Sequence, residues 1–393
     1  MRVVGVDPGT KTFDVVVVED GKVVLEESFD TFEVARNPAP LVDFLGETQG
    51  DYVVAPSGYG APVTRGDEVV SPRRFAVEVL LLSTERDIEA GRFEGEVGIW
   101  VYDALAKVVD TLVKKFRDRV LFLPGVVHLR TVPRYRKINK VDMGTVDKLA
   151  STFVAVDSYA QRYSADYEKV NVVVVELGYG YNAAVAVERG RVVDGVGGTY
   201  ASVGTLTAGA LDLEIVANTG TWLRWDVFHG GLFGALGVYE LEKIVSGYVE
   251  SAEPYYSVFN SFIEGVVKDV RRVLVSTPRA EAVILSGRHA KNSVVRRAIS
   301  ERVQDLDVLV STGLRGSLRS KEAAQGYAAI GSGLAGGEFR ELVKHMEIGG
   351  ACGTAVDYVV HPRASRFVER VRRAYLESVS APKICHEGTP PPR

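Results

Sequence analysis

Two stretches of the chain share one pattern of apolar runs and turns. In residues 3–25, a run of β-branched residues leads to an acidic residue and a glycine turn; a second apolar run, a charged turn with glycine and a third run follow. Residues 172–193 repeat that order. Apolar runs joined by tight turns predict a β-meander. The repetition of the meander predicts a duplicated architecture.

After each meander, short apolar runs alternate with amphipathic segments. In the first half the pattern predicts strands at 51–56 and 119–123 and helices at about 71–90, 98–116 and 144–162. In the second half it predicts strands at 282–286 and 307–311 and helices at 257–276, 292–303 and 322–334. Strands separated by helices imply crossover connections and partly parallel sheets. We therefore expect an α/β fold with lobes at residues 1–168 and 169–382 and a disordered tail at 383–393.

The composition narrows the classes of partner. A formal net charge of −4 gives no general attraction to nucleic acid or to an anionic membrane, so any phosphate site must create its own local field. No apolar run reaches the roughly 18–20 residues that span a bilayer, and the first residues form a predicted strand. Cys352 and Cys385 have no metal-ligand spacing. We expect no disulfide, a reducing compartment and a cytoplasmic location.

The first chemical motif follows the first predicted strand. Asp7 ends the strand and Gly9 opens a turn in which Thr10 and Lys11 are potential donors to phosphate oxygens. Glycine lets backbone N–H groups approach a phosphate closely, and a carboxylate such as Asp7 is a typical ligand for Mg²⁺. Taken alone, the motif is equally consistent with an ordinary hairpin turn.

The second motif occupies the matching position of the second meander. Glu176 ends a strand, Gly178 and Gly180 lie in the turn, and Asn182 begins the next strand. This segment too fits an ordinary hairpin, but two such turns in matched positions favour two halves of one phosphate site.

The third motif joins a strand to a helix. The buried run 282–286 leads into Gly287 and Arg288, a type of junction at which nucleotides commonly bind in α/β sheets. We therefore assign Gly287 and Arg288 to the nucleotide site. His289 is more simply explained as a packing or capping residue than as a catalyst.

Two polar segments come near the end of the first half. Residues 128–140 are basic and contain an aromatic residue. They fit a solvated surface loop, and less well a segment that steers an anionic substrate; RNA binding is a weaker third alternative given the net charge. Asp142 and Lys148 flank the start of a predicted helix, where Asp142 is either an N-terminal cap or a substrate-site residue.

The order of the three glycine motifs resembles that of the actin-like ATPase and acid and sugar kinase superfamily. The chain is most similar to butyrate kinase and related short-chain acid kinases: VDPGTKTFDVVV resembles the first phosphate turn, VVVELGYGYNAAVAVERGRVVDG the second, and VVAPSGYGAPVTRGDEVV a glycine-rich substrate segment. The likeness covers about residues 1–336. It implies two RNase H-like lobes around a nucleotide cleft, with ATP and Mg²⁺ as cofactors and a small carboxylate as phosphoryl acceptor.

The resemblance also implies residue roles. Asp7 would hold Mg²⁺, while Arg65, Asp142 or Lys148 would orient the acceptor. The short-chain acid kinases usually carry Asn in place of Asp7 and His in place of Glu176, whereas sugar kinases have a carboxylate pair.

Several alternatives therefore stay open. One is a kinase of a hydroxylated small molecule, with Asp142 or Glu176 as base, and another is a switch that hydrolyses ATP without a small acceptor. Glu176 is either a base or a support for the metal, and Arg288 either stacks on adenine or narrows the pocket. No nucleic acid or membrane partner is expected. The resemblance leaves a homodimer open, because acid kinases are commonly dimers.

Overall fold

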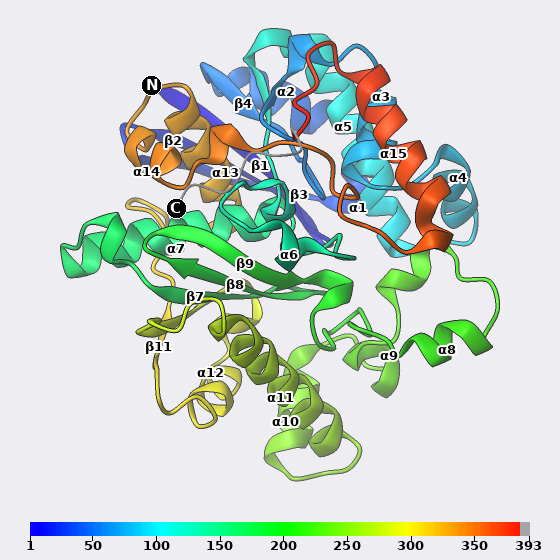
Figure 1. Cartoon of the computed structure of the whole chain (residues 1–393), viewed down its shortest axis with the longest axis vertical. Helices are drawn as coiled ribbons and strands as arrows, with labels where there is room; N and C mark the ends of the chain where they lie inside the picture. The colour runs from blue at the N-terminus through cyan, green and yellow to red at the C-terminus, as the bar shows by residue number, and fades with distance from the viewer. Residues whose placement is uncertain (386–393) are drawn as a thin grey trace.

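Two mixed sheets form the framework of the protein (Figure 1). The computed structural model describes residues 1–385. The six-stranded sheet has the order β3-β2-β1-β4-β6-β5 and the five-stranded sheet the order β11-β10-β7-β8-β9. The strands are β1 (Arg2–Pro8), β2 (Thr12–Glu19), β3 (Lys22–Asp30), β4 (Tyr52–Val54), β5 (Thr64–Arg65), β6 (Val120–Phe122), β7 (Val172–Leu177), β8 (Asn182–Glu188), β9 (Arg191–Gly197), β10 (Ala282–Ser286) and β11 (Asp307–Val310).

The sheets share one plan, which confirms the predicted duplication. Each begins with an antiparallel meander, and each then adds parallel strands beside the first strand of the meander. Corresponding residues lie 169 positions apart, as Asp7 and Glu176 do at the ends of β1 and β7. The register shift of β2 between Val17 and Val18 recurs in β8 between Ala186 and Val187. The second turns also match, since Asp20-Gly21 and Arg189-Gly190 all have positive φ, as a type I′ hairpin requires.

The first two strands of each meander are buried on both faces. Val3 and Val16 belong to the central core between the sheets, while their neighbours Val4 and Val15 pack on the outer helices. The five-stranded sheet alternates in the same way. Successive side chains on a strand point to opposite faces, so strands covered on both sides are continuously apolar. This explains the valine runs in the sequence.

Helices cover both sheets. The longer ones are α2 (Ala39–Glu47), α4 (Glu85–Phe93), α5 (Val97–Phe116), α7 (Val146–Tyr163), α10 (Leu241–Val249), α11 (Tyr255–Leu274), α12 (Ser293–Ser300), α13 (Glu322–Leu334) and α15 (Ser365–Ser378). Shorter ones are α1 (Thr31–Arg36), α3 (Pro72–Arg74), α6 (Arg134–Lys137), α8 (Leu213–Asn218), α9 (Leu232–Leu236) and α14 (Arg340–His345).

Two central helices cross between the halves of the chain. The six-stranded sheet takes its strands from residues 2–122 and the five-stranded sheet from 172–310, on either side of the predicted boundary at 168/169. However, α7 packs on β7, β8 and β10, whereas α13 packs on β1, β2 and β4, and the two helices contact each other. Their N-termini therefore meet between the sheets. The division of the domains at 168/169 stays a prediction.

Most predicted elements are present, but one helix is wrong. The strand at 282–286 and the helix at 322–334 have the predicted bounds. The helix predicted at 71–90 is instead a turn of α3, a π-helical segment at Phe75–Leu80 and a separate helix α4. Leu82 has a positive φ and so ends the first segment. Thr84 then starts α4 as its N-cap, accepting a hydrogen bond from the Asp87 N–H.

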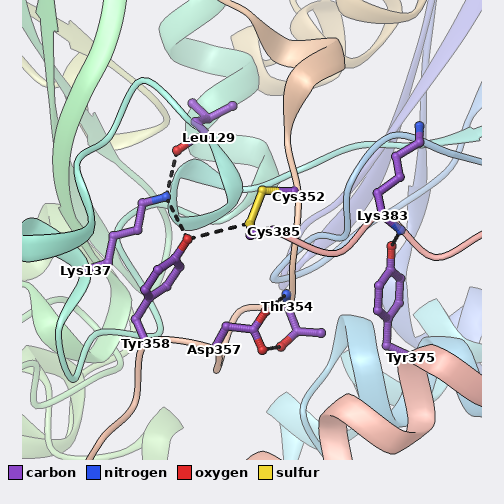
Figure 2. Close-up of a disulfide and its surroundings, with 9 residues drawn as sticks. All are labelled: Leu129, Lys137, Cys352, Thr354, Asp357, Tyr358, Tyr375, Lys383 and Cys385. Atoms are coloured by element: carbon purple, nitrogen blue, oxygen red, sulfur yellow. Dashed lines mark hydrogen bonds between the residues drawn. A yellow bond between two sulfur atoms is a disulfide. The ribbon is translucent and has the colours of Figure 1, made fainter. Parts of the chain in front are cut away.

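The C-terminal segment is attached to the body of the protein. Cys352 and Cys385 form a disulfide beside Tyr358 and Lys137 (Figure 2), so the prediction of no disulfide is wrong. The two cysteines are 33 residues apart, and this separation hid their proximity in the sequence. The tail predicted at 383–393 falls mostly outside the described residues, but Lys383 is bonded through its N–H to Tyr375 Oη. In residues 1–385, no helix is both long and apolar enough to cross a membrane. The cytoplasmic location stays a prediction.

Candidate active site

A cavity of about 190 Å³ lies where β1, β7 and β10 end and α7 and α13 begin. It brings the three glycine motifs together. From them it is lined by Asp7, Gly9, Thr10, Lys11, Glu176, Gly178, Gly180, Gly287 and Arg288. The helix starts and the neighbouring loops add Tyr59, Tyr102, Asp142, Asp147, Lys148, Lys321 and Glu322. Carboxyl ends of parallel strands are a usual place for ligands in α/β proteins.

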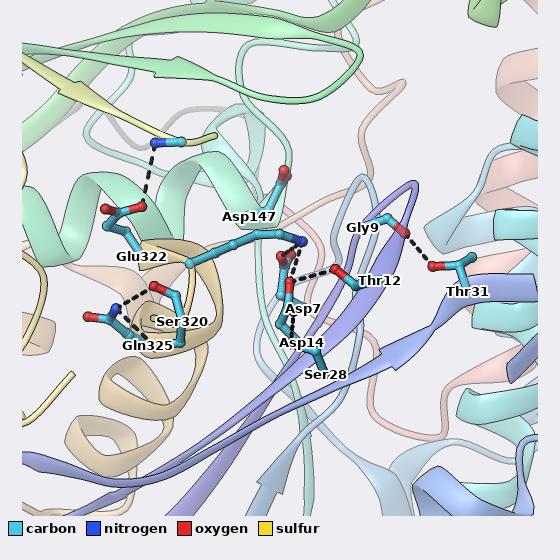
Figure 3. A network of polar contacts seen from close by, with 12 residues as sticks. Asp7, Gly9, Thr12, Asp14, Ser28, Thr31, Asp147, Ser320, Glu322 and Gln325 are labelled. Atoms are coloured by element: carbon cyan, nitrogen blue, oxygen red, sulfur yellow. Dashed lines mark hydrogen bonds and ion pairs between the residues drawn. The ribbon is translucent and has the colours of Figure 1, made fainter. Parts of the chain in front are cut away.

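The first phosphate turn carries a buried carboxylate pair around a lysine (Figure 3). Asp7 is 4% exposed, and its Oδ2 lies 3.5 Å from Lys321 Nζ. Lys321 also pairs with Asp14, which accepts hydrogen bonds from Thr12 and Ser28. Burial raises the pKa of Asp7 to about 7, although the attraction of Lys321 opposes this rise. Asp14 thus holds Lys321 beside Asp7 from the next strand of the meander.

The second turn carries a matching pair. Glu176 Oε2 lies 2.5 Å from Lys148 Nζ, and Lys148 also binds Asp147 Oδ2 at 2.7 Å. Burial raises the pKa of Glu176, and Lys148 opposes that effect. A buried charge is stable only when it is paired. Lys148 therefore offsets part of the cost of burying the Glu176 carboxylate in the site.

Two cations at the mouth of the cavity have no carboxylate partner within residues 1–385. Lys11 Nζ lies 4.4 Å from the centroid of the Tyr179 ring, and the Arg288 guanidinium lies 5.9 Å from it. All three residues also line a neighbouring cavity of about 360 Å³, together with Tyr239, Glu242, His289 and Asn292. The two cavities thus adjoin at Tyr179, and the two cations between them are available to an anionic ligand.

Gly287 sits where the third motif meets the other two. Its φ is +87°, and a Cβ at this position would lie 2.6 Å from Glu176 Oε1. The left-handed conformation and the close approach both require glycine. The Gly287 N–H also points to Glu322 Oε2 at 3.5 Å, at the first residue of α13 (Figure 3). Any larger residue here would collide with the second turn, at the Glu176 carboxylate and the Leu177 carbonyl.

The opposite end of the cavity is apolar and aromatic. Its lining includes Leu81, Val101, Tyr102, Leu105 and Phe228. Behind it lies Arg224, from the segment between α8 and α9. Arg224 Nη2 donates to Tyr102 Oη at 2.7 Å, to the Leu81 carbonyl at 3.1 Å and to Tyr59 Oη at 3.4 Å. Its Nε is buried without a hydrogen-bond partner among the described residues.

Asp142 stands between the two ends. The side chain is buried and accepts a hydrogen bond from the Gly144 N–H at 3.0 Å. Burial raises the pKa of Asp142 to about 6, and that hydrogen bond only partly offsets the rise. A carboxyl group with a pKa in this range is suited to exchange a proton near neutral pH.

Two residues assigned to the site from the sequence lie elsewhere. Arg65 is exposed at the edge strand β5, where it forms a two-point ion pair with Asp67. Asn182 is buried beside the second turn, and its Nδ2 donates to the Val203 carbonyl without lining the cavity. Both placements are corrections: Arg65 ends a two-residue strand and points to solvent, and Asn182 anchors a loop.

Lys321, Asp14 and Arg224 were not recognised from the sequence. Lys321 directly precedes a predicted helix, and this position was the only feature of the sequence that could have suggested a role for it in the site. Asp14 lies inside an apolar strand, whose hairpin pairs Asp14 opposite Asp7. Arg224 lies in a segment without a recognisable motif, so only the tertiary structure brings it to the cavity.

Comparison with known proteins places the chain in a family. The model of a family described as "Protein of unknown function (DUF1464)" matches residues 5–361. The chain belongs to this family. That description names no activity.

Solved structures identify the fold. The chain is similar to a propionate kinase from Francisella tularensis, with a TM-score of 0.56 at 12% identity over 83% of this chain and 98% of that one. It is similar to the acetate kinase of Porphyromonas gingivalis, with a TM-score of 0.55 at 12% identity over 83% and 97%. A third similar structure is the acetate kinase of Entamoeba histolytica, with a TM-score of 0.51 at 13% identity over 77% and 86%. The fold is thus the predicted pair of RNase H-like lobes of the actin-like ATPases.

Proposed function

We propose that the protein is an ATP-dependent phosphotransferase that acts on a small carboxylate. One observation carries the proposal: both phosphate turns and the Gly287 junction line a single cavity whose far end is apolar and backed by the half-buried Arg224. The likeness to acetate and propionate kinases supports the same class of reaction, and the resemblance of the turns to those of butyrate kinase supports a short-chain acid.

The lining fits a nucleotide. The base and ribose would occupy the cavity beyond Tyr179, and the phosphates would lie against the glycine turns with Lys11 and Arg288 as their cationic contacts. Mg²⁺ would neutralise charge on the β- and γ-phosphates when bound. In residues 1–385 no group of three or more His, Cys, Asp or Glu is arranged to hold a metal. Asp7 would therefore share the ion with phosphate oxygens and water.

The acceptor would bind at the apolar end. A short hydrocarbon chain fits among Leu81, Val101 and Leu105, while its carboxylate would lie between the Arg224 guanidinium and the glycine turns. A carboxylate with a pKa of about 4–5 is ionised at neutral pH and needs no base. One of its oxygens would attack the γ-phosphorus, the bond to the β–γ bridging oxygen would break, and ADP would leave. The paired lysines Lys148 and Lys321 keep the surrounding carboxylates from repelling the acceptor.

A second candidate is a kinase of a hydroxylated molecule. Asp142 favours it, because a buried carboxylate with a pKa near 6 is suited to remove a proton from a hydroxyl group. Glu176 is less suited to that role, because Lys148 already holds it as an ion pair.

Nucleotide binding is the first test. Calorimetry should detect Mg-ATP binding to the wild type, and Asp7→Ala should weaken that binding at least ten-fold with magnesium present but little with EDTA. Arg65→Ala is the matched control, since Arg65 lies on the surface away from the cavity. Equal affinities for the Asp7→Ala and Arg65→Ala proteins in magnesium would contradict the assignment.

The acceptor is the second test. Enzyme and Mg-ATP would be incubated with short straight and branched carboxylates and hydroxylamine, and polyols and sugars would be assayed in parallel for ADP release. An acyl phosphate is a mixed anhydride, so it should be trapped as a hydroxamate. Two results together would favour the hydroxyl acceptor. One is ADP release with a polyol and no hydroxamate, and the other is a turnover in Asp142→Asn that is roughly 10²–10⁴ lower than in the wild type. ADP release independent of every acceptor would favour a nucleotide-dependent switch.

A further inference from the structure

A second cavity lies on the opposite side of the α6 segment. Its volume is about 530 Å³, and it shares no lining residue with the nucleotide cavity. Residues 130–137, residues 350–358, α15 and the end of the described chain form its walls. The disulfide Cys352–Cys385 is part of the lining and attaches the end of the described chain to the wall formed by residues 350–358 (Figure 2).

The polar part of this cavity is positively charged. Arg130, Arg134, Lys137 and Arg372 line it. The lining contains a single carboxylate within residues 1–385, that of Asp357. Its two oxygens already accept hydrogen bonds from the Thr354 N–H and hydroxyl and from Arg372 Nε. Arg130 and Arg134 have no ion pair in the described part of the chain, so their charge is available to a ligand.

Lys137 forms the floor of the charged part. It is 2% exposed, and its Nζ donates to the Leu129 carbonyl at 2.7 Å and to Tyr358 Oη at 3.5 Å (Figure 2). No carboxylate pairs with this ammonium group within residues 1–385. Burying an unpaired cation is costly, so a bound anion would stabilise the charged form of Lys137.

The other part of the cavity is apolar. Val132 and Pro133 line it from one side, and Leu376, Ile384 and the disulfide from the other. Leu376 and Ile384 are half exposed to solvent, at 49% and 56%. A ligand with a compact anionic group and an apolar body would cover these side chains while its charge reached the arginines. A bare inorganic ion would leave them exposed.

We propose that this cavity is a second ligand site for a small phosphate monoester with an apolar body. The phosphate contacts Arg130, Arg134 and Lys137, and the apolar body lies on the wall that the disulfide holds in place. This assignment gives the basic segment at 128–140 a role distinct from steering a substrate into the nucleotide cleft. The site is independent of the proposed kinase activity, because the two cavities share no residue.

The test uses the full chain in phosphate-free buffer with three probes: phenyl phosphate, inorganic phosphate and phenol. Calorimetry should give the tightest binding for phenyl phosphate, weaker binding for inorganic phosphate and none for phenol. The double variant Arg130→Ala with Arg134→Ala should weaken phenyl phosphate at least ten-fold. Both arginines are exposed, so the thermal midpoint should stay within a few degrees of the wild type.

Two control variants separate this site from others. Arg373→Ala removes an exposed charge next to Arg372 that does not line the cavity, and it should leave the affinity unchanged. Lys11→Ala removes a cation of the nucleotide cavity, and phenyl phosphate binding should survive it. Loss of binding in Lys11→Ala, or unchanged binding in the double variant, would overturn the proposal. Equal affinities for phenyl phosphate and inorganic phosphate would overturn the assignment of the apolar wall.

Discussion

The charged residues of the nucleotide cavity fall into a paired and an unpaired set. Lys148 is buried and Lys321 is half-buried, and each lies beside carboxylates, whereas Lys11 and Arg288 are exposed at the mouth. Pattern alone predicted Asp7, Lys11, Glu176 and Arg288, because each lies at the end of a strand or in the glycine turn that follows it. It could not give the partner lysine Lys321, because the contact joins residues more than 300 positions apart.

Lys137 provides a residue-scale prediction about pH. Burial lowers its pKa from 10.5 to about 7. Between these values the unfolded chain binds more protons than the folded one, so this residue makes the free energy of unfolding rise with pH from about 7 to 10.5. Below pH 7 the folded protein bears the full cost of burying the charged Lys137 side chain. Lys137→Met should therefore gain stability relative to the wild type as pH falls from 10 to 6.

Urea unfolding at several pH values in phosphate-free buffer would measure this difference. Lys137→Met also loses the hydrogen bond to the Leu129 carbonyl, which lowers its stability by a similar amount at every pH. The informative quantity is thus the pH dependence of the difference in the free energy of unfolding between Lys137→Met and the wild type. Lys114→Met, at an exposed lysine of α5, is the control. Parallel curves for Lys137→Met and the wild type would contradict the lowered pKa.

At the scale of elements, the sequence predicted those helices and strands whose apolar residues follow a regular local pattern. The meanders, β10 and α13 were found because their apolar residues alternate or recur without interruption. The break at Leu82 was missed, because an apolar residue with positive φ leaves no sign in the hydrophobic pattern. Helix α15 was not predicted, although Val368, Val371 and Tyr375 follow helical spacing. Its buried face became clear only from its packing on the first lobe.

The contact between α7 and α13 yields an element-scale prediction. A Cβ added at Gly326 of α13 would lie 2.1 Å from the Ala150 carbonyl oxygen of α7. Backbone atoms in a packed helix cannot move away cheaply, so Gly326→Ala should lower the free energy of unfolding by about 1–3 kcal/mol or more. Gly234→Ala in α9 is the matched control, because its added Cβ meets nothing within 4 Å. It should be neutral or stabilising by up to about 1 kcal/mol. Equal midpoints in chemical denaturation would refute the close packing of the two helices.

At the scale of the whole molecule, the segment before α9 connects the lobes across the cavity. Phe228 packs edge-on against Tyr102 of α5, and His229 Nε2 lies 2.9 Å from Glu96 Oε2. Arg224 reaches Tyr59 and Tyr102 from the same segment. The lobes themselves were predictable from the duplicated pattern. This bridge was not, because it depends on contacts between residues more than 100 positions apart and has no counterpart in the first half.

Arg224 therefore gives the prediction that best separates the two candidate functions. If a carboxylate binds at the apolar end, Arg224→Met removes its charged hydrogen-bond donor, a loss of about 1.5–3 kcal/mol. At about 1.4 kcal/mol per tenfold, kcat/KM for the acid should fall roughly 10- to 100-fold while the affinity for Mg-ATP stays unchanged. Arg224→Lys keeps the charge and should recover part of the loss, which excludes simple misfolding as the cause. Arg297→Met, at an exposed arginine of α12, should have no effect. A hydroxylated acceptor carries no charge for Arg224 to bind, so a turnover that responds to Asp142→Asn but not to Arg224→Met would instead establish the hydroxyl kinase.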